Sequence, residues 1–258
     1  MSEAVATPPS ADALQEPSVD KSGDRVKRMF GEIAPRYDLL NHLLSGNVDR
    51  YWRWRTTHIV PPVTTGPLAG SPILDLCTGT GDLALAYDKA ANGNLPITAA
   101  DFCPQMLALG EQKGAKRGVN DHIEWVEANA NKLQFADDTY QLVTAAFGLR
   151  NVSGTDAGLR EMTRVTRPGG KVAILEFTTP RWQPMKAIYG WYFRNVLPRI
   201  GQAVMRNNSA AYEYLPESVK AFYEYEQLTE RMASAGLSNV RFHPLTFGIA
   251  TLYVGEKN

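Results

Sequence analysis

Short apolar segments alternate with amphipathic segments through the middle of the chain. The apolar runs predict buried strands over residues 71–77, 95–101, 122–128, 140–147 and 171–177, the last entered through an RPGG turn. Between them, residues 82–91, 104–117 and 156–166 have the spacing of helices. Strands that alternate with helices in this way predict an α/β fold with a parallel, doubly wound sheet.

Helical patterns flank this region on both sides. Residues 26–33, 37–46 and 49–60 predict helices, so we expect 23–62 to form a lid over the carboxyl edge of the sheet. After the fifth strand, 178–212 is rich in aromatic and Arg residues and predicts a helical insertion. A helix over 217–235 and strands over 239–245 and 248–257 complete the expected domain, 23–258. The polar tail, 1–22, is expected to be disordered.

The composition is that of an ordinary globular protein. The 258 residues include 27 basic and 27 acidic side chains, so the formal net charge is zero. A neutral chain gives no electrostatic reason to expect a nucleic-acid partner. The sequence has no apolar run of roughly 20 residues, and its two cysteines offer no disulfide framework. We therefore expect a cytoplasmic protein.

The segment ILDLCTGTGDLA, residues 73–84, predicts a nucleotide-binding turn between a strand and a helix. Gly79 and Gly81 permit a tight turn and a close approach of the backbone, and the following helix offers free N–H groups. Asp101 ends the next strand, where a carboxylate can accept hydrogen bonds from both hydroxyls of a ribose. The glycine spacing alone also fits a nicotinamide cofactor.

Asp75 favours a different cofactor. A carboxylate beside the loop repels a pyrophosphate but attracts an ammonium or a sulfonium group. S-adenosylmethionine carries both groups and no phosphate, so we expect it in place of NAD. Asn129 and Ala130 follow the third strand, where adenine could be recognised; a solvated turn is the alternative. The sequence has no Cys-x-x-Cys and no paired His at ligand spacing, so no metal is assigned.

Several segments together resemble the S-adenosylmethionine-dependent C-methyltransferases of ubiquinone and menaquinone biosynthesis. These segments are FGEIAPRYDLLNHLLSGNVDRYWR, the glycine loop, EANANKLQF, FGLRN and RVTRPGGKVAILEF. The resemblance implies a class I, Rossmann-like methyltransferase fold with a seven-stranded, mostly parallel sheet and a helical cover. It also implies methylation of a ring carbon of a polyprenylated hydroquinone. By position, it places Thr80, Asp101, Asn129 and Ala130 in contact with the cofactor.

The chain departs from the family pattern at several positions. Leu40 stands where the family often has Met, and Asp49 where it often has His. Ala146 replaces a Ser that contributes to the cofactor site in some members, and Thr178 replaces the Ser of an EFS motif. The resemblance therefore supports no cofactor role for position 146 and no role for a His at position 49.

Four residues are catalytic candidates under this reading. Arg150 and Asn151 follow the fourth strand at the carboxyl edge, where sites form in open α/β sheets. Arg150 can stabilise a developing phenolate or orient a water, although a structural ion pair explains it equally well. Tyr37 and Asp38 belong to the expected lid, with packing and helix capping as the alternative.

The acceptor is the least determined part of the prediction. The tail is acidic and not Arg-rich, which is unlike a mitochondrial presequence, so demethylmenaquinol is expected; the ubiquinone-pathway benzoquinol stays open because bacteria make both quinones. The aromatic insertion can hold the isoprenoid tail or contact the inner face of the membrane peripherally, and a packed cover is the alternative. Another phenol or lipid acceptor, an NAD-dependent oxidoreductase and a non-catalytic assembly protein are further alternatives. An oligomer is compatible with the sequence.

Overall fold

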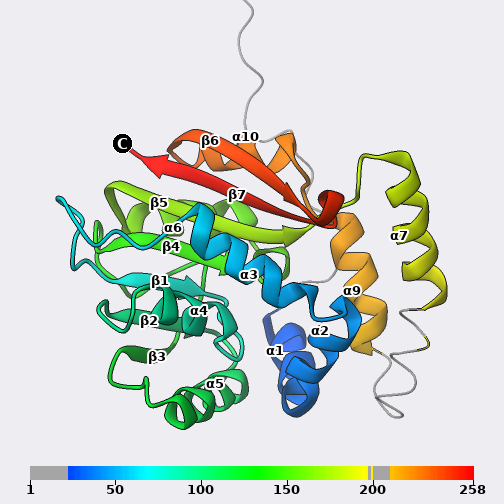
Figure 1. Cartoon of the computed structure of the whole chain (residues 1–258), viewed down its shortest axis with the longest axis horizontal. Helices are drawn as coiled ribbons and strands as arrows, with labels where there is room; N and C mark the ends of the chain where they lie inside the picture. The colour runs from blue at the N-terminus through cyan, green and yellow to red at the C-terminus, as the bar shows by residue number, and fades with distance from the viewer. Residues whose placement is uncertain (1–22, 197–198, 200–209) are drawn as a thin grey trace, which may run out of the picture.

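A computed structural model describes residues 23–196, 199 and 210–258 (Figure 1). The predicted tail, 1–22, and part of the predicted insertion lie outside the described residues. Seven strands form one sheet in the order β3-β2-β1-β4-β5-β7-β6. β7 pairs antiparallel with β5 and β6, and the other four pairs of neighbouring strands are parallel. The strands are β1 (Ile73–Leu76), β2 (Ile97–Asp101), β3 (Ile123–Glu127), β4 (Tyr140–Ala146), β5 (Thr166–Phe177), β6 (Leu237–Leu245) and β7 (Ala250–Lys257).

Helices cover both faces of this sheet and so confirm the predicted α/β fold class. On one face, α6 (Thr155–Val165) and α10 (Glu226–Ser234) pack with β1, β4 and β5 in one apolar core. On the other face, α3 (Val48–Ile59) and α4 (Asp82–Ala90) build a second core, and α5 (Pro104–Arg117) contacts β2 and β3. The continuous apolar runs of the central strands follow from burial on both sides.

The carboxyl edge of the parallel strands is covered by the remaining helices. These are α1 (Gly23–Ile33), α2 (Tyr37–Ser45), α7 (Gln183–Asn195) and α9 (Ala210–Ala221). In Figure 1 they stand together at the right of the sheet, where the β5 arrow points. The described parts of 23–62 and 178–212 therefore approach the same edge, although residues 63–177 separate the two segments in the chain.

Two local predictions were wrong. The helix predicted over 217–235 is two helices, because the chain breaks at Tyr225, which has φ +51° and donates its N–H to the Tyr253 hydroxyl at 2.7 Å. The RPGG segment is not a turn before a strand. It lies inside β5 as an irregularity of the pairing with β4, and Gly169 takes φ +78° there.

Candidate active site

The glycine loop joins β1 to α4 as the sequence predicted. Gly79 and Gly81 have φ values of +58° and +80°, which side chains other than glycine adopt at a cost. A Cβ at Gly81 would also lie 2.3 Å from the Trp125 ring, so only glycine fits there. The Gly79 N–H donates to Asp101 Oδ2 at 2.8 Å, which ties the loop to the end of β2.

Asp75 lies beneath the loop and not beside it. Its side chain is 1% exposed, and Oδ2 accepts hydrogen bonds from Thr78 Oγ1 at 2.5 Å and from the Ala84 N–H at 3.1 Å. Burial raises the pKa of Asp75 to about 7. Asp75 thus holds the loop onto α4 and does not line the described clefts, and its contact with the cofactor stays a prediction.

A cleft with about 830 Å³ of empty space opens above the loop at the carboxyl edge. Gly79, Asp101, Asn129 and Ala130 line it, so these four predicted cofactor residues come together. Asn151 also lines this cleft, and its Oδ1 atom is buried with no hydrogen-bond partner in the described structure. An unpaired buried acceptor is costly, which is expected where a ligand supplies the donor.

The Asp101 carboxylate is held in place by backbone N–H groups. Burial raises the pKa of Asp101 to about 6, although the N–H groups of Cys103 and Gly79 oppose the effect. Cys103 donates to Oδ1 at 2.9 Å, so each oxygen already holds one backbone hydrogen bond. Each oxygen has a further lone pair, so the carboxylate can still accept hydrogen bonds from a ribose.

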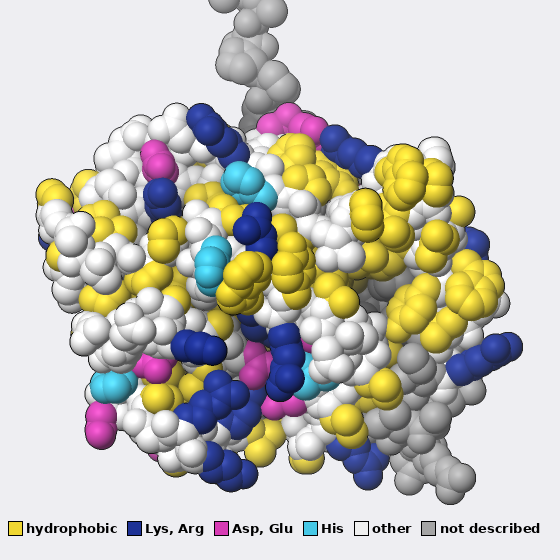
Figure 2. All heavy atoms as spheres, in the orientation of Figure 1, with side chains coloured by type: hydrophobic (Ala, Val, Ile, Leu, Met, Phe, Trp, Pro, Cys, Tyr) yellow, Lys and Arg dark blue, Asp and Glu magenta, His cyan; other side chains and the backbone are white. Residues whose placement is uncertain are grey.

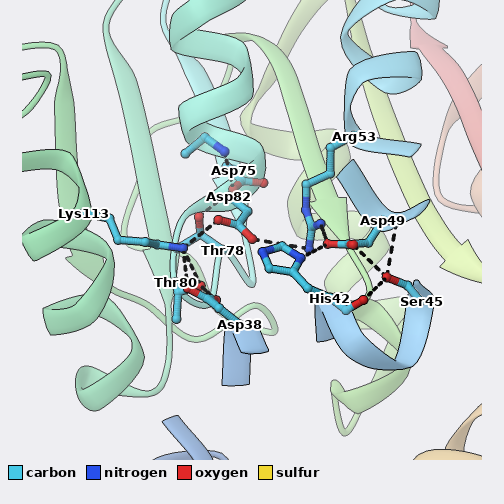
Figure 3. Close-up of polar contacts among 11 residues, drawn as sticks. Asp38, His42, Ser45, Asp49, Arg53, Asp75, Thr78, Thr80, Asp82 and Lys113 are labelled. Carbon is cyan, nitrogen blue, oxygen red and sulfur yellow. Dashed lines mark hydrogen bonds and ion pairs between the residues drawn. The ribbon is translucent and has the colours of Figure 1, made fainter. Parts of the chain in front are cut away.

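Thr80 and Asp38 belong to a polar cluster beside the glycine loop and do not line the cleft above it, and their predicted roles stay predictions. The Thr80 hydroxyl donates to Asp38 Oδ1 at 2.5 Å. Lys113 Nζ donates to Asp38 Oδ2 at 2.8 Å, to Thr80 Oγ1 at 3.0 Å and to Asp82 Oδ1 at 2.6 Å (Figure 3). The cluster thereby joins α2, α5 and the glycine loop, so Asp38 anchors the lid.

A second ionic cluster lies beside the first. Asp49 accepts hydrogen bonds from Ser45 and Arg53, and its Oδ2 lies 2.9 Å from His42 Nδ1 (Figure 3). His42, Asp49 and Asp82 are close enough to share a metal ion, a grouping that the sequence spacing did not predict. The guanidinium of Arg53 lies between the two carboxylates, with Nη2 at 3.8 Å from Asp82 Oδ2, so a side-chain cation balances their charge.

A larger, apolar cavity with about 1800 Å³ of empty space lies between the lid and the sheet edge. Most of its walls come from α1, α2, α3 and α7. The apolar and aromatic side chains that line it are Met29, Phe30, Ile33, Tyr37, Leu40, Leu43, Leu44, Val48, Trp52, Phe147, Phe177, Met185, Ile188, Tyr189, Tyr192, Tyr214 and Ile249. Such a surface suits a hydrocarbon ligand.

The two clefts meet. Phe30, Tyr37 and Phe147 line both of them, so a ligand in one cleft reaches the neighbourhood of a ligand in the other. Burial raises the pKa of the Tyr37 phenol, so this group is neutral at physiological pH. Tyr37 thus lies where the two clefts meet, and its catalytic role stays a prediction.

Arg150 enters the apolar cavity as half of a buried ion pair. It is 6% exposed and Glu176 is 1% exposed; Arg150 Nη1 donates to Glu176 Oε2 at 2.9 Å and also to the Phe147 carbonyl. Glu176 Oε1 accepts from the Arg150 N–H at 3.2 Å. Arg150 Nε is buried with no partner in the described structure. One nitrogen of the guanidinium is thus fixed by the protein, while Nε keeps a free hydrogen.

Sequence reasoning assigned no role to Glu176 or to the aromatic floor of the cavity. Glu176 is the last residue but one of the fifth predicted strand, and a carboxylate at that place was the available signal. Trp52, Phe147 and Phe177 form the floor, with ring centroids 4.5–5.9 Å apart. Trp52 comes from the lid and the two Phe residues from strand ends, so their sequence positions gave no sign that they meet.

Comparison with known proteins agrees with this geometry. Residues 18–257 match the ubiE/COQ5 methyltransferase family. The ubiquinone/menaquinone biosynthesis C-methyltransferase UbiE of Geotalea daltonii is 43% identical over 92% of this chain and 98% of its own length. The demethylmenaquinone methyltransferase of Thermus thermophilus is 45% identical over 89% of this chain and 100% of its own.

Solved structures share the fold at low sequence identity. A SAM-dependent methyltransferase from Thermotoga maritima aligns with a TM-score of 0.62 at 12% identity, over 90% of this chain and 100% of its own. The [4+2]-cyclase SpnF aligns with a TM-score of 0.66 at 14% identity, over 95% of this chain and 99% of its own. A cyclase on the same scaffold shows that the fold alone does not settle the reaction. The sequence match over most of the chain identifies the family. This chain belongs to the ubiE/COQ5 methyltransferase family, and its cofactor is S-adenosylmethionine.

Proposed function

We propose that this chain transfers a methyl group from S-adenosylmethionine to a ring carbon of demethylmenaquinol. The observation that carries the proposal is that the cleft above the glycine loop, which Asp101 lines, meets a large apolar cavity at Phe30, Tyr37 and Phe147. Relatives from Thermus thermophilus and Deinococcus radiodurans, which are named demethylmenaquinone methyltransferases, support a naphthoquinol acceptor.

The cofactor cleft offers a partner for each part of the donor. Asp101 would accept hydrogen bonds from the ribose, and Asn129 with Ala130 would border the adenine. Gly79 allows the backbone to approach closely. When bound, S-adenosylmethionine supplies an electrophilic methyl group on its sulfonium. Asn151, first predicted as catalytic, lines this cleft and not the apolar cavity, so we assign its free Oδ1 to the cofactor.

The ring carbon that accepts the methyl group must be electron-rich, because it attacks an electrophilic methyl group. A hydroquinone meets this requirement, more strongly as its phenolic proton is lost, whereas an oxidised quinone is electron-poor. A phenol has a pKa of about 10, so a fixed cation beside the oxygen assists ionisation at neutral pH. Arg150 suits that task as a hydrogen-bond donor, since a guanidinium stays protonated and cannot act as a base. Glu176 holds it in place.

The cavity extends to the molecular surface beside exposed apolar side chains. Leu43 and Ile188 line it and are also 47% and 59% exposed. Further exposed large apolar residues are Leu39, Tyr51, Trp54, Trp182, Trp191 and Phe247. Figure 2 shows hydrophobic side chains gathered at the right of the molecule, where Figure 1 places α7. We propose that this surface rests on the membrane and admits the isoprenoid tail.

Within the described residues, no helix is long and apolar enough to cross a membrane. We propose a peripheral contact, with aromatic side chains at the interface and the cavity mouth towards the lipid. Trp and Tyr favour this position because their rings are apolar and carry one polar group.

Analysis of quinones tests the acceptor directly. In cells that lack this protein, lipid extracts should accumulate demethylmenaquinone, and the wild-type gene should restore menaquinone. Accumulation of a demethylated benzoquinone alone would replace the proposed acceptor with that of the ubiquinone pathway. An unchanged quinone profile would refute both.

A further inference from the structure

The apolar cavity contains one acidic side chain among the described residues that line it, Asp49. Asp49 lies in the first turn of α3 and is 3% exposed. Ser45 Oγ donates to its Oδ1 at 2.7 Å, whereas Oδ2 receives Arg53 and lies 2.9 Å from His42 Nδ1. A buried carboxylate in an apolar wall is costly unless it is bound on every side, and Oδ1 is the less occupied oxygen.

The carboxylate is charged at neutral pH. Burial raises the pKa of Asp49, but the hydrogen bond from Ser45 and the charge of Arg53 outweigh burial and bring the pKa below its ordinary value. An ionised carboxylate accepts hydrogen bonds and cannot donate one. Asp49 therefore presents a pure acceptor to the cavity.

The two redox states of a quinone ring interact differently with a hydrogen-bond acceptor such as this carboxylate. Each ring oxygen of a hydroquinone carries a hydrogen and can donate it, whereas each carbonyl of a quinone only accepts. A fixed acceptor beside a ring oxygen thus attracts the hydroxyl and repels the carbonyl. Arg53 Nη1 binds Asp49 Oδ2, whereas Oδ1 receives one hydrogen bond, from Ser45, so Oδ1 has a lone pair for a ring hydroxyl.

We infer that Asp49 determines specificity for the reduced ring by accepting a hydrogen bond from a quinol hydroxyl and excluding the quinone. The inference rests on the proposed function, since it takes a quinol as the acceptor. Arg150 reaches the same cavity from the sheet edge and Asp49 from the lid. A quinol ring in the cavity would thus meet a hydrogen-bond donor, Arg150, and a hydrogen-bond acceptor, Asp49. One ring oxygen would accept from Arg150, and the other would donate its hydrogen to Asp49.

Binding of both redox states to the purified protein tests this inference. We would titrate short-chain 1,4-naphthoquinol and 1,4-naphthoquinone anaerobically by calorimetry. The wild-type protein should prefer the quinol by about tenfold or more, the range expected for a hydrogen bond to a charged group. Asp49→Asn should bring the preference close to unity, because an amide can donate to a carbonyl as well as accept from a hydroxyl.

Asp88→Asn is the matched control. Asp88 is also a buried acid beside a histidine, with Oδ1 at 3.2 Å from His122 Nδ1, but it lines neither cleft. Its replacement should leave the redox preference as in the wild type. Ser45→Ala keeps the carboxylate and frees Oδ1, so it should retain or increase the preference, and it tests the inference even where Asp49→Asn does not fold.

An unchanged preference in folded Asp49→Asn, or a lost preference in Ser45→Ala, would overturn the role of Asp49. Failure of the wild-type protein to methylate any quinol would instead overturn the proposed function. Methyl transfer by the wild type, measured beside the titrations, keeps the two outcomes apart.

Discussion

Arg150 is the single residue on which the proposed chemistry depends most. Its Nη1 is fixed by Glu176 and the Phe147 carbonyl, and its Nε has no hydrogen-bond partner in the described structure. Arg150→Ala should lower turnover by about 100-fold, in the range for loss of one fixed oxyanion donor, with little change in the affinity for S-adenosylmethionine. Initial rates and calorimetry measure both quantities.

Two further variants separate chemistry from folding. Arg150→Ala leaves Glu176 buried and unpaired, so the double variant Arg150→Ala with Glu176→Ala should melt higher than the single one and stay inactive. Arg160→Ala, which removes an exposed arginine of α6, should behave as the wild type. Wild-type turnover in folded Arg150→Ala would remove this residue from the mechanism.

Asp75 gives the stability of the fold a defined dependence on pH. Its pKa is about 7 in the folded protein and about 4 when unfolded, so the folded state favours the protonated form. This contribution to the free energy of unfolding is complete below pH 4 and is lost as the pH rises through 7. We therefore compare the free energy of unfolding of Asp75→Asn with that of the wild type, as measured by urea unfolding. The difference, variant minus wild type, should be larger at pH 8 than at pH 5. A difference between the two proteins that does not vary with pH would contradict the account.

At the scale of elements, the lid is held to the glycine loop by Lys113. This residue of α5 binds Asp38 of α2 and Asp82 of α4, and all three side chains are half-buried. Lys113→Ala should raise the KM for S-adenosylmethionine severalfold and speed hydrogen exchange in α2, while it lowers the free energy of unfolding by only about 1 kcal/mol. Lys116→Ala, an exposed lysine of the same helix, is the control. Unchanged exchange in α2 would show that the lid is held by apolar packing alone.

The strands and helices were predictable because their patterns are local. The period of apolar residues predicted the bounds of β1 to β5 and of α4 to α6 to within a few residues. The glycine loop was predicted between β1 and α4, where the structure has it. The break at Tyr225 was not predictable, since it depends on a hydrogen bond to Tyr253 from another element. The neighbours of Asp38, Thr80 and Asn151 were not predictable, because the sequence gives a side chain's element and not its direction.

At the scale of the whole molecule, the exposed apolar surface around α7 links catalysis to the membrane. The double variant Ile188→Ser with Trp191→Ser removes two side chains that are 59% and 57% exposed. It should bind phosphatidylglycerol vesicles at least about tenfold more weakly, given roughly 2 kcal/mol for each buried apolar side chain. Activity should fall with long-chain quinol in vesicles and persist with a short-chain quinol in solution. Equal vesicle binding by variant and wild type would refute the membrane contact.

The most direct test of the central claim is methyl transfer by the purified protein. We would supply S-adenosylmethionine with a labelled methyl group and demethylmenaquinone, with and without a chemical reductant, and analyse the lipid product by mass spectrometry. The account predicts labelled menaquinone with the methyl on a ring carbon, formed only when the reductant has produced the quinol. Equal rates without reductant, a methyl group on oxygen, or no transfer to the reduced lipid would contradict it.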